Sequence, residues 1–98
     1  MVARVGEEGD IGTMEIVDML FTVKGPTAGA IMIEWNVRAS EQGAAAMWDS
    51  HIRIGGGVGT DLDVEKCPKG SFNKACICVS LLLHVTKDAS GYFENVWA

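Results

Sequence analysis

Two glutamates of the chain have neighbours suited to acid–base chemistry. Glu34 is followed by Trp35, and Glu94 lies in the aromatic-rich run 92–97. A carboxyl group can donate a proton near neutral pH when burial beside apolar groups raises its pKa. Glu34 and Glu94 are therefore the candidate catalytic residues.

Strand periodicity offers a simpler interpretation of both glutamates. It places Glu34 opposite Trp35, on an outer face where a carboxylate is normally solvated. It places Asn95 on the same face as Phe93, where its amide can join a ladder of stacked amides inside the fold. Glu94 then faces the other way.

The tryptophans divide into two groups. Trp35 and Trp97 fall on apolar faces, and we expect both to pack in the core. Trp48 borders a polar stretch and is the better candidate for stacking against a flat ligand. Asp49 and His51 share one face of the same alternating run. They are expected to form a hydrogen-bonded pair, either beside a cleft or at a surface turn.

The three cysteines leave two states open. In an oxidising compartment Cys67 and Cys76 can form a disulfide that closes a short loop, whereas in the cytosol all three residues would be thiols. With that disulfide formed, Cys78 is an unpaired thiol expected to face outward. The cysteines and His84 match no standard zinc-site spacing, so no metal site is predicted.

Composition narrows the classes of partner. The chain has 98 residues, 48% of them hydrophobic, and a net charge of −5. An acidic chain without a Lys/Arg cluster is poorly suited to nucleic acid or anionic membranes, so neither is an expected partner. The N-terminus lacks the apolar core of a signal peptide, and no apolar run reaches the roughly 18 residues of a membrane helix. Neutral substrates such as sugars stay open.

Strand patterns dominate the chain. Alternating apolar residues predict strands over residues 14–23, 30–37, 48–54, 76–86 and 92–98. Residues 39–47 are rich in helix formers and are predicted to make one or two helical turns. Residues 60–75 form a mostly polar excursion.

A weak internal repeat suggests how these strands are arranged. Residues 18–37 and 81–98 share an order of strand, lysine-led turn with glycine, and strand with Glu and Asn beside Trp. Short strands with one apolar face each, joined by turns, are typical of a solenoid whose coils cover one another. Periodicity alone leaves a small β-sandwich open. A short solenoid exposes strand edges at both ends, so the isolated chain is expected to be aggregation-prone or marginally stable.

Several motifs occur in the order found in a known family. They are EIVDMLFT at 15–22, GPTAGA at 25–30, IEWN at 33–36, MWDSHIRIGG at 47–56 and YFENVW at 92–97. On these motifs the chain resembles glycoside hydrolase family 55, β-1,3-glucanases built from two tandem right-handed β-helices of the pectate-lyase-like class. The resemblance spans nearly the whole chain but only part of the second β-helix. The expected fold is all-β, a partial right-handed parallel β-helix of about two to three coils, with residues 1–98 forming one domain incomplete at both ends.

The resemblance implies an activity for the parent protein. It would be a glucan 1,3-β-glucosidase that hydrolyses β-1,3-glucan with inversion and without a cofactor. Inversion requires an acid and a base about 6.5–9.5 Å apart, and the family's acid is a glutamate of the second β-helix. Glu34 and Glu94 are the candidates for it, and Trp48, Asp49 and His51 are the candidates for substrate binding.

The resemblance also bears on location and partners. The parent would be extracellular, where a Cys67–Cys76 disulfide is stable, and its partners would be β-1,3-glucan and the remainder of the β-helix. The isolated chain is expected to be inactive. Two alternatives stay open: a non-catalytic glycan-binding or structural solenoid piece, and a gene remnant without independent function.

Overall fold

The computed structural model describes residues 1–98 and consists of short strands with one 3-10 turn (Lys74–Cys76). The strands are β1 (Ala3–Val5), β2 (Ile11–Gly12), β3 (Met14–Val17), β4 (Leu20–Phe21), β5 (Ala30–Trp35), β6 (Arg38–Ala39), β7 (Ala45–Trp48), β8 (His51–Ile52), β9 (Val79–Val85) and β10 (Tyr92–Glu94). The structure contains no helix with the length and hydropathy needed to cross a bilayer.

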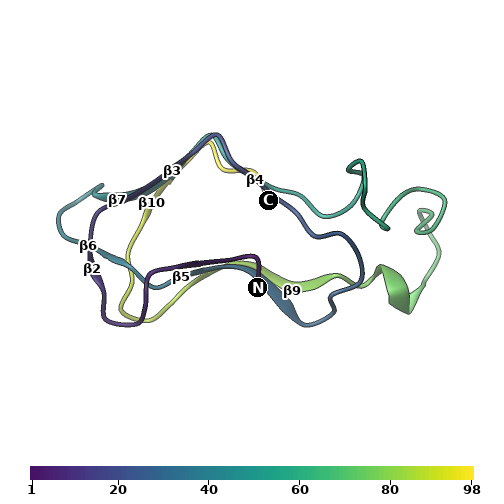
Figure 1. Cartoon of the computed structure of the whole chain (residues 1–98), viewed down its shortest axis with the longest axis horizontal. Coiled ribbons are helices and arrows are strands. Elements are labelled where there is room, and N and C mark those ends of the chain that lie inside the picture. Colours follow the sequence, from purple (N-terminus) through teal and green to yellow (C-terminus); the bar gives the residue numbers. More distant parts are fainter.

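All strand pairs are parallel, so strands far apart in the sequence lie side by side. The strand orders are β1-β5-β9, β10-β7-β3, β2-β6 and β4-β8. Figure 1 shows successive passes of the chain lying almost on top of one another around an elongated outline, with the excursion after β8 projecting at one end. Strands of a β-sandwich are antiparallel, so this pairing differs from that alternative.

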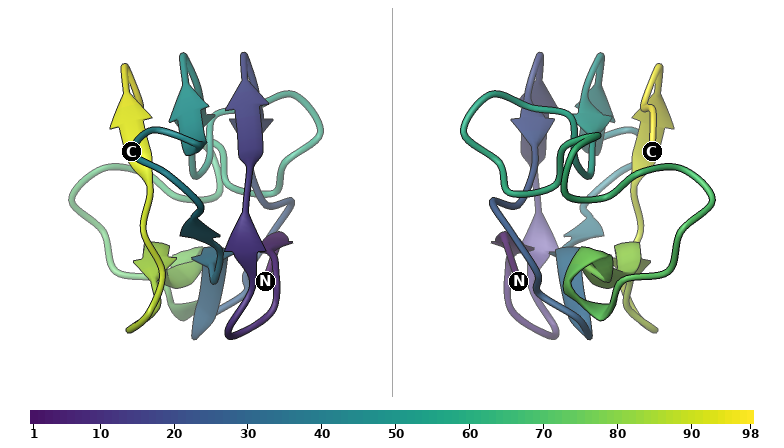
Figure 2. Two further views of the ribbon diagram at one scale, coloured as in Figure 1. Left: turned by 90° about the vertical axis from the view of Figure 1, so that its left-hand side faces the viewer. Right: turned by 90° about the vertical axis from the view of Figure 1, so that its right-hand side faces the viewer.

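The chain makes three passes, which contain β1 to β4, β5 to β8, and β9 with β10. The middle pass, β5 to β8, supplies most of the core. Strands β5 and β7 each have a partner on both sides, and Figure 2 shows β7 between β3 and β10. The buried cluster comprises Val5, Phe21, Met32, Ile33, Trp35, Val37, Ala45, Met47 and Ile52. Trp35 crosses the interior to meet Phe93 edge to face, with 5.1 Å between ring centroids. Its indole N–H donates to the Ser90 carbonyl at 3.0 Å, so the one polar atom of this buried ring is satisfied.

The predicted helical turns within residues 39–47 are wrong. The chain there contains β6, a turn and β7, and Ala45, Ala46 and Met47 are fully buried. Helix propensity is a weak local preference, whereas β7 gains hydrogen bonds and packing from neighbours on both sides.

The predicted long strands are also interrupted, once in each pass. Asp18, Asp49 and Asn95 have left-handed backbone angles, with φ of 57°, 53° and 52°. Each residue follows a strand of the β3-β7-β10 sheet and redirects the chain, a conformation that Asp and Asn tolerate better than other non-glycine residues. The Asp18 N–H donates to the Trp48 carbonyl, and the Asp49 N–H donates to the Glu94 carbonyl. The three corners are therefore stacked.

Truncation of Met47 tests the importance of the middle pass. Met47 is fully buried between Ile16 and Phe93 in the strand register, whereas Met19 is 48% exposed. Met47→Ala should lower the free energy of unfolding by about 2–4 kcal/mol through lost burial and a residual cavity. Met19→Ala is the matched control and should change it by less than about 0.5 kcal/mol. Urea unfolding followed by far-UV circular dichroism gives both values, and equal losses would contradict the burial pattern.

Candidate functional site

Strands β7 and β10 present an aromatic and acidic outer surface. Phe93 and Met47 are aligned and point inward, so the next aligned pair, Glu94 and Trp48, points outward. The rings of Trp48 and Tyr92 lie 6.3 Å apart between centroids at 50°. The Tyr92 hydroxyl donates to Glu94 Oε1 at 3.1 Å. This bond raises the pKa of Tyr92, because ionising the phenol would remove the donated proton.

The corner that follows these strands continues the surface. Asn95 Nδ2 donates to Asp49 Oδ1 at 2.7 Å, and Trp97 Nε1 donates to Asn95 Oδ1 at 2.8 Å. Trp97 is paired with His51 by a parallel bridge, and both side chains are exposed. We define the outer patch as the side chains of Trp48, Asp49, His51, Tyr92, Glu94, Asn95 and Trp97.

Two predictions about this corner are wrong for one reason. Trp97 was expected in the core but is 64% exposed, and Asn95 was expected inside but is also exposed. The left-handed angle of Asn95 resets the alternation, so residues on either side of it do not continue one strand face. The left-handed backbone at Asp49 interrupts the strand in the same way, so Asp49 and His51 do not share one strand face. The expected Asp49–His51 hydrogen bond is replaced by the bond from Asn95.

The outer patch gathers four of the five residues predicted for catalysis and binding. These are Trp48, Asp49, His51 and Glu94, and only Glu34 lies elsewhere. Sequence reasoning missed Tyr92 and Trp97 as members of the patch. Tyr92 lies two residues before Glu94, and this spacing indicates that both side chains lie on one face of a strand. The position of Trp97 depends on the left-handed backbone at Asn95, which the sequence pattern does not show.

The outer patch is open to solvent. Trp48, Asp49, His51 and Glu94 line none of five depressions of the surface, and Tyr92 lines one of them, a depression of about 220 Å³ beside Ser90 and Gly91. Glu94 is exposed, so it lacks the apolar enclosure that a proton-donating carboxyl needs. The patch in this chain is therefore an open surface and not an enclosed catalytic cleft.

Glu34 lies in a different environment, on the outer side of β5. Its Oε1 is 3.2 Å from Arg4 Nε and accepts from Asn36 Nδ2 at 3.0 Å. The bond from Asn36, with further help from Arg4, lowers the pKa of Glu34. Glu34 is therefore a carboxylate at neutral pH, suited to accepting hydrogen bonds and not to donating a proton.

A polar depression of about 490 Å³ surrounds Glu34. Its lining residues are Arg4, Glu7, Glu8, Glu34, Asn36, His84, Thr86 and Lys87. His84 is aligned with Glu34 across the strand pair, and its Nδ1 is buried without a hydrogen-bond partner. No group of three or more His, Cys, Asp or Glu side chains is arranged to hold a metal ion.

Glu34 and Glu94 do not face one cleft. Each is next to one member of the Trp35–Phe93 contact that crosses the interior. Because neighbouring residues of a strand point to opposite sides, the two glutamates point away from the core on opposite sheets. The chain by itself therefore does not hold these two carboxyls as an acid–base pair.

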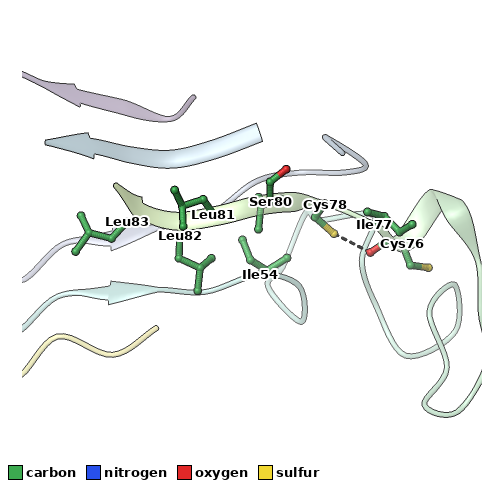
Figure 3. Close-up of a pocket in the computed structure, with 9 residues that line it drawn as sticks. Ile54, Cys76, Ile77, Cys78, Ser80, Leu81, Leu82 and Leu83 are labelled. Carbon is green, nitrogen blue, oxygen red and sulfur yellow. Dashed lines mark hydrogen bonds between the residues drawn. The ribbon is translucent and has the colours of Figure 1, made fainter. Parts of the chain in front are cut away.

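The cysteines lie in and beside the excursion. Cys67 and Cys76 form a disulfide with 5.9 Å between their Cα atoms, which is the pairing considered for an oxidising compartment. Cys78 is buried, so its predicted outward orientation is wrong. Its thiol donates to the Cys76 carbonyl at 2.9 Å, and burial raises its pKa. Figure 3 shows Cys78 in an apolar groove of about 780 Å³ with Ile54 and Leu82.

Similar curated proteins fall into two groups by name. A non-secreted LysM effector from Penicillium expansum, LysM15, is 55% identical over 97% of this chain. A probable glucan endo-1,3-beta-glucosidase from Arthroderma benhamiae is 40% identical over 96% of it, and a glucan 1,3-beta-glucosidase from Cochliobolus carbonum is 39% identical over 98%. No protein-family model matches the chain.

The matched segment is a small part of each relative. The chain spans 7% of the length of LysM15, 11% of the Arthroderma protein and 12% of the Cochliobolus protein. Most of each named protein therefore lies outside the segment shared with this chain. The comparisons establish homology to segments of proteins named glucan 1,3-beta-glucosidase.

Substitution of Asp49 tests the stacked corner. Asp49→Ala loses the bond from Asn95 and places alanine at φ 53°, which should cost about 1–2 kcal/mol of stability. Asp49→Asn keeps an acceptor oxygen and a residue that tolerates this angle, so it should stay within about 0.5 kcal/mol of the wild type. Urea unfolding of the three proteins provides the test, and equal stability of the two variants would argue against the corner as described.

The lowered pKa of Glu34 predicts a pH dependence of stability. Because the folded pKa lies below the ordinary value of 4.5, the stabilising contribution is fully present above pH 4.5. It is lost as the pH falls through the lower, folded-state pKa. Glu34→Gln should reduce the loss of stability on acidification, whereas Glu8→Gln, at a carboxylate without a hydrogen bond, should follow the wild type. The urea concentration at the midpoint of unfolding is measured for the three proteins across this pH range. An identical decrease of the midpoint on acidification in all three would contradict the prediction.

Proposed function

We propose that the chain is a section of a right-handed parallel β-helix from a family 55 glycoside hydrolase. The parent would be a secreted enzyme that hydrolyses β-1,3-glucan with inversion and without a cofactor. Support comes from the parallel pairing, in which aligned positions of successive passes lie side by side. Further support comes from the relative named glucan 1,3-beta-glucosidase, which is similar over 98% of the chain.

The outer patch is the part of the chain proposed to contact glucan. The apolar faces of sugar rings stack on aromatic side chains, and the Trp48–Tyr92 pair offers two adjacent ring surfaces. Asp49, His51 and Glu94 add polar groups that can bond sugar hydroxyls. The observation that carries this proposal is the alignment of Glu94 beside Trp48 on one outward face.

Within this proposal the two glutamates have different roles. Glu94 is the better candidate for the general acid, because it adjoins aromatic side chains in the outer patch. It would need apolar enclosure from another part of the parent to become a proton donor. Glu34 is held as a carboxylate by Asn36 and Arg4, which suits an acceptor role. The isolated chain would therefore bind glucan without hydrolysing it.

A second candidate function is non-catalytic glycan binding by the whole protein from which the chain comes. The exposure of most residues of the outer patch, Glu94 among them, supports this alternative, because a binding surface needs no enclosed acid. Two relatives named LysM effectors, at 55% and 50% identity, carry names that describe no hydrolysis. Hydrolysis by the full-length parent, abolished by Glu94→Gln, would favour the enzyme over this alternative.

The role of Trp48 can be tested on the chain itself. Trp48→Ala should weaken binding of β-1,3-gluco-oligosaccharides about tenfold or more, as for a central aromatic contact. Phe72→Ala is the matched control, because Phe72 is an exposed aromatic residue in the excursion, outside the patch. Isothermal titration calorimetry measures both affinities, and a reducing-sugar assay on the same samples should detect no product.

Three results would contradict the proposal. Equal affinity of wild type and Trp48→Ala would remove the patch as the binding surface. Absence of any glucan binding by the folded wild type would have the same effect. Release of sugar by the isolated chain would show that it is catalytically complete.

A further inference from the structure

The polar depression around Glu34 results from connections of unequal length. The first pass has residues 6–10 between β1 and β2, whereas the middle pass has only residues 36–37 between β5 and β6. The third pass turns at the same corner, where the Ala89 N–H donates to the Thr86 carbonyl at 3.0 Å. Figure 1 shows the first and third passes extending beyond the middle pass here. The depression is therefore a step in the middle pass with a turn on each side.

The floor of the depression belongs to β5, which pairs with β1 on one side and β9 on the other. Arg4, Glu34 and His84 occupy aligned positions on these three strands. The next aligned pair, Val5 and Trp35, is buried, so the row before it points to the outer side. Side chains from all three passes thus meet over the central strand.

The buried side chain of Asn36 holds this floor together. Its Nδ2 donates to the Gly6 carbonyl and to Glu34 Oε1, each at 3.0 Å, and its Oδ1 accepts from the Thr86 hydroxyl at 3.0 Å. These bonds use Oε1 of Glu34 and leave Oε2 for another donor. Because the carboxylate is already fixed, a ligand that donates to Oε2 does not have to immobilise it.

His84 provides a second group that a ligand can satisfy. Its Nδ1 is the one buried side-chain nitrogen or oxygen of the chain without a hydrogen-bond partner. A buried polar atom without a partner costs about 1–3 kcal/mol, and such atoms are rare in folded proteins. A ligand group that bonds to Nδ1 after a rotation of the imidazole would remove this cost.

The charges of the lining favour a neutral ligand. Arg4 and Lys87 supply two positive charges, and Lys87 makes no ion pair within the chain. Three negative charges come from Glu7, Glu8 and Glu34. An anion would meet the three carboxylates and a cation would meet the two basic groups, whereas a hydroxyl group can both donate and accept. No hydrophobic side chain lines the depression, which suits a ligand that is polar on all sides.

We propose that this depression is a separate binding site for a neutral polyhydroxylated ligand with the size of one pyranose ring. One hydroxyl donates to Glu34 Oε2, a neighbouring hydroxyl bonds to the His84 imidazole, and a third accepts from Lys87. The volume of about 490 Å³ lies in the range of small-molecule sites. The site is on the β1-β5-β9 sheet and the outer patch is on β7 and β10, so the proposal does not depend on glucan binding at that patch.

Amide chemical shifts of the isotope-labelled chain locate the site. Titration with methyl β-D-glucopyranoside, a neutral pyranose, should produce saturable shifts at residues 34–36 and 84–87. Acetate and methylammonium are the charged probes, and each should bind at least about tenfold more weakly than the glucoside.

Two substitutions test the contacts. Glu34→Gln keeps the size of the side chain but removes its charge, and it should raise the dissociation constant for the glucoside at least about tenfold. Glu65→Gln, at an exposed carboxylate of the excursion, is the matched control and should bind like the wild type. Because Glu34 also contributes to stability, Lys87→Met provides a variant at an exposed residue outside the hydrogen-bond network. It should weaken binding at least about threefold without changing the urea midpoint.

Three results would overturn the site. The first is the absence of saturable shifts at residues 34–36 and 84–87. The second is an affinity for the glucoside that neither Glu34→Gln nor Lys87→Met lowers. The third is tighter binding of acetate or methylammonium than of the glucoside, which would indicate an ion site.

Trp48→Ala separates this site from the outer patch. The glucoside shifts at residues 34–36 and 84–87 should be the same in this variant as in the wild type, even if its binding of gluco-oligosaccharides is lost. Loss of these shifts in Trp48→Ala would show that the glucoside binds at the outer patch and would also overturn the proposal.

Discussion

The rest of the structure depends on the parallel alignment of equivalent residues in successive passes of the chain. Each pass provides only a few strand residues, too few to bury an apolar face alone. The middle pass is buried because it has a neighbour on each side. Trp35 of β5 and Met47 of β7 are therefore fully buried, although β7 has only four residues. The outer passes provide this cover and are themselves covered on one side only.

The same alignment determines what appears on the outer surface. A strand shows every second residue to solvent, and parallel stacking brings those residues from different passes together. Trp48 and Glu94 become neighbours in this way although they are far apart in the sequence. The left-handed corners at Asp49 and Asn95 then turn the chain so that His51 and Trp97 extend the same surface. The outer patch is thus assembled from short strands and the corners that follow them.

The strand content of the chain was predictable, because alternating apolar residues depend only on local sequence. The polar environment of Glu34 was partly predictable, since alternation with Ile33 and Trp35 placed it outward. The corners were not predictable, because an aspartate with positive φ has the same sequence signal as an aspartate in a polar strand position. Without the corners, the strand pattern assigned Trp97 to the core and paired Asp49 with His51. In the structure Trp97 is exposed and Asp49 accepts from Asn95.

The sequence pattern also does not show the strand register or which distant segments bury a residue. Helix propensity in residues 39–47 gave way to pairing of β7 on both sides, which no local pattern shows. Cys78 was expected to face outward from its strand, but it is buried and lines a depression together with Ile54 and with Leu62 of the excursion. In both cases a segment distant in the sequence decided the environment of a residue.

The parallel alignment can be measured directly by nuclear Overhauser contacts between backbone protons of the dilute, isotope-labelled chain. The aligned passes predict sequential sets of contacts from β7 to both β3 and β10, with Met47 near Ile16 on one side and near Phe93 on the other. Contacts that run in opposite order along either neighbour would show antiparallel pairing and a closed sandwich, and would contradict the stacked arrangement.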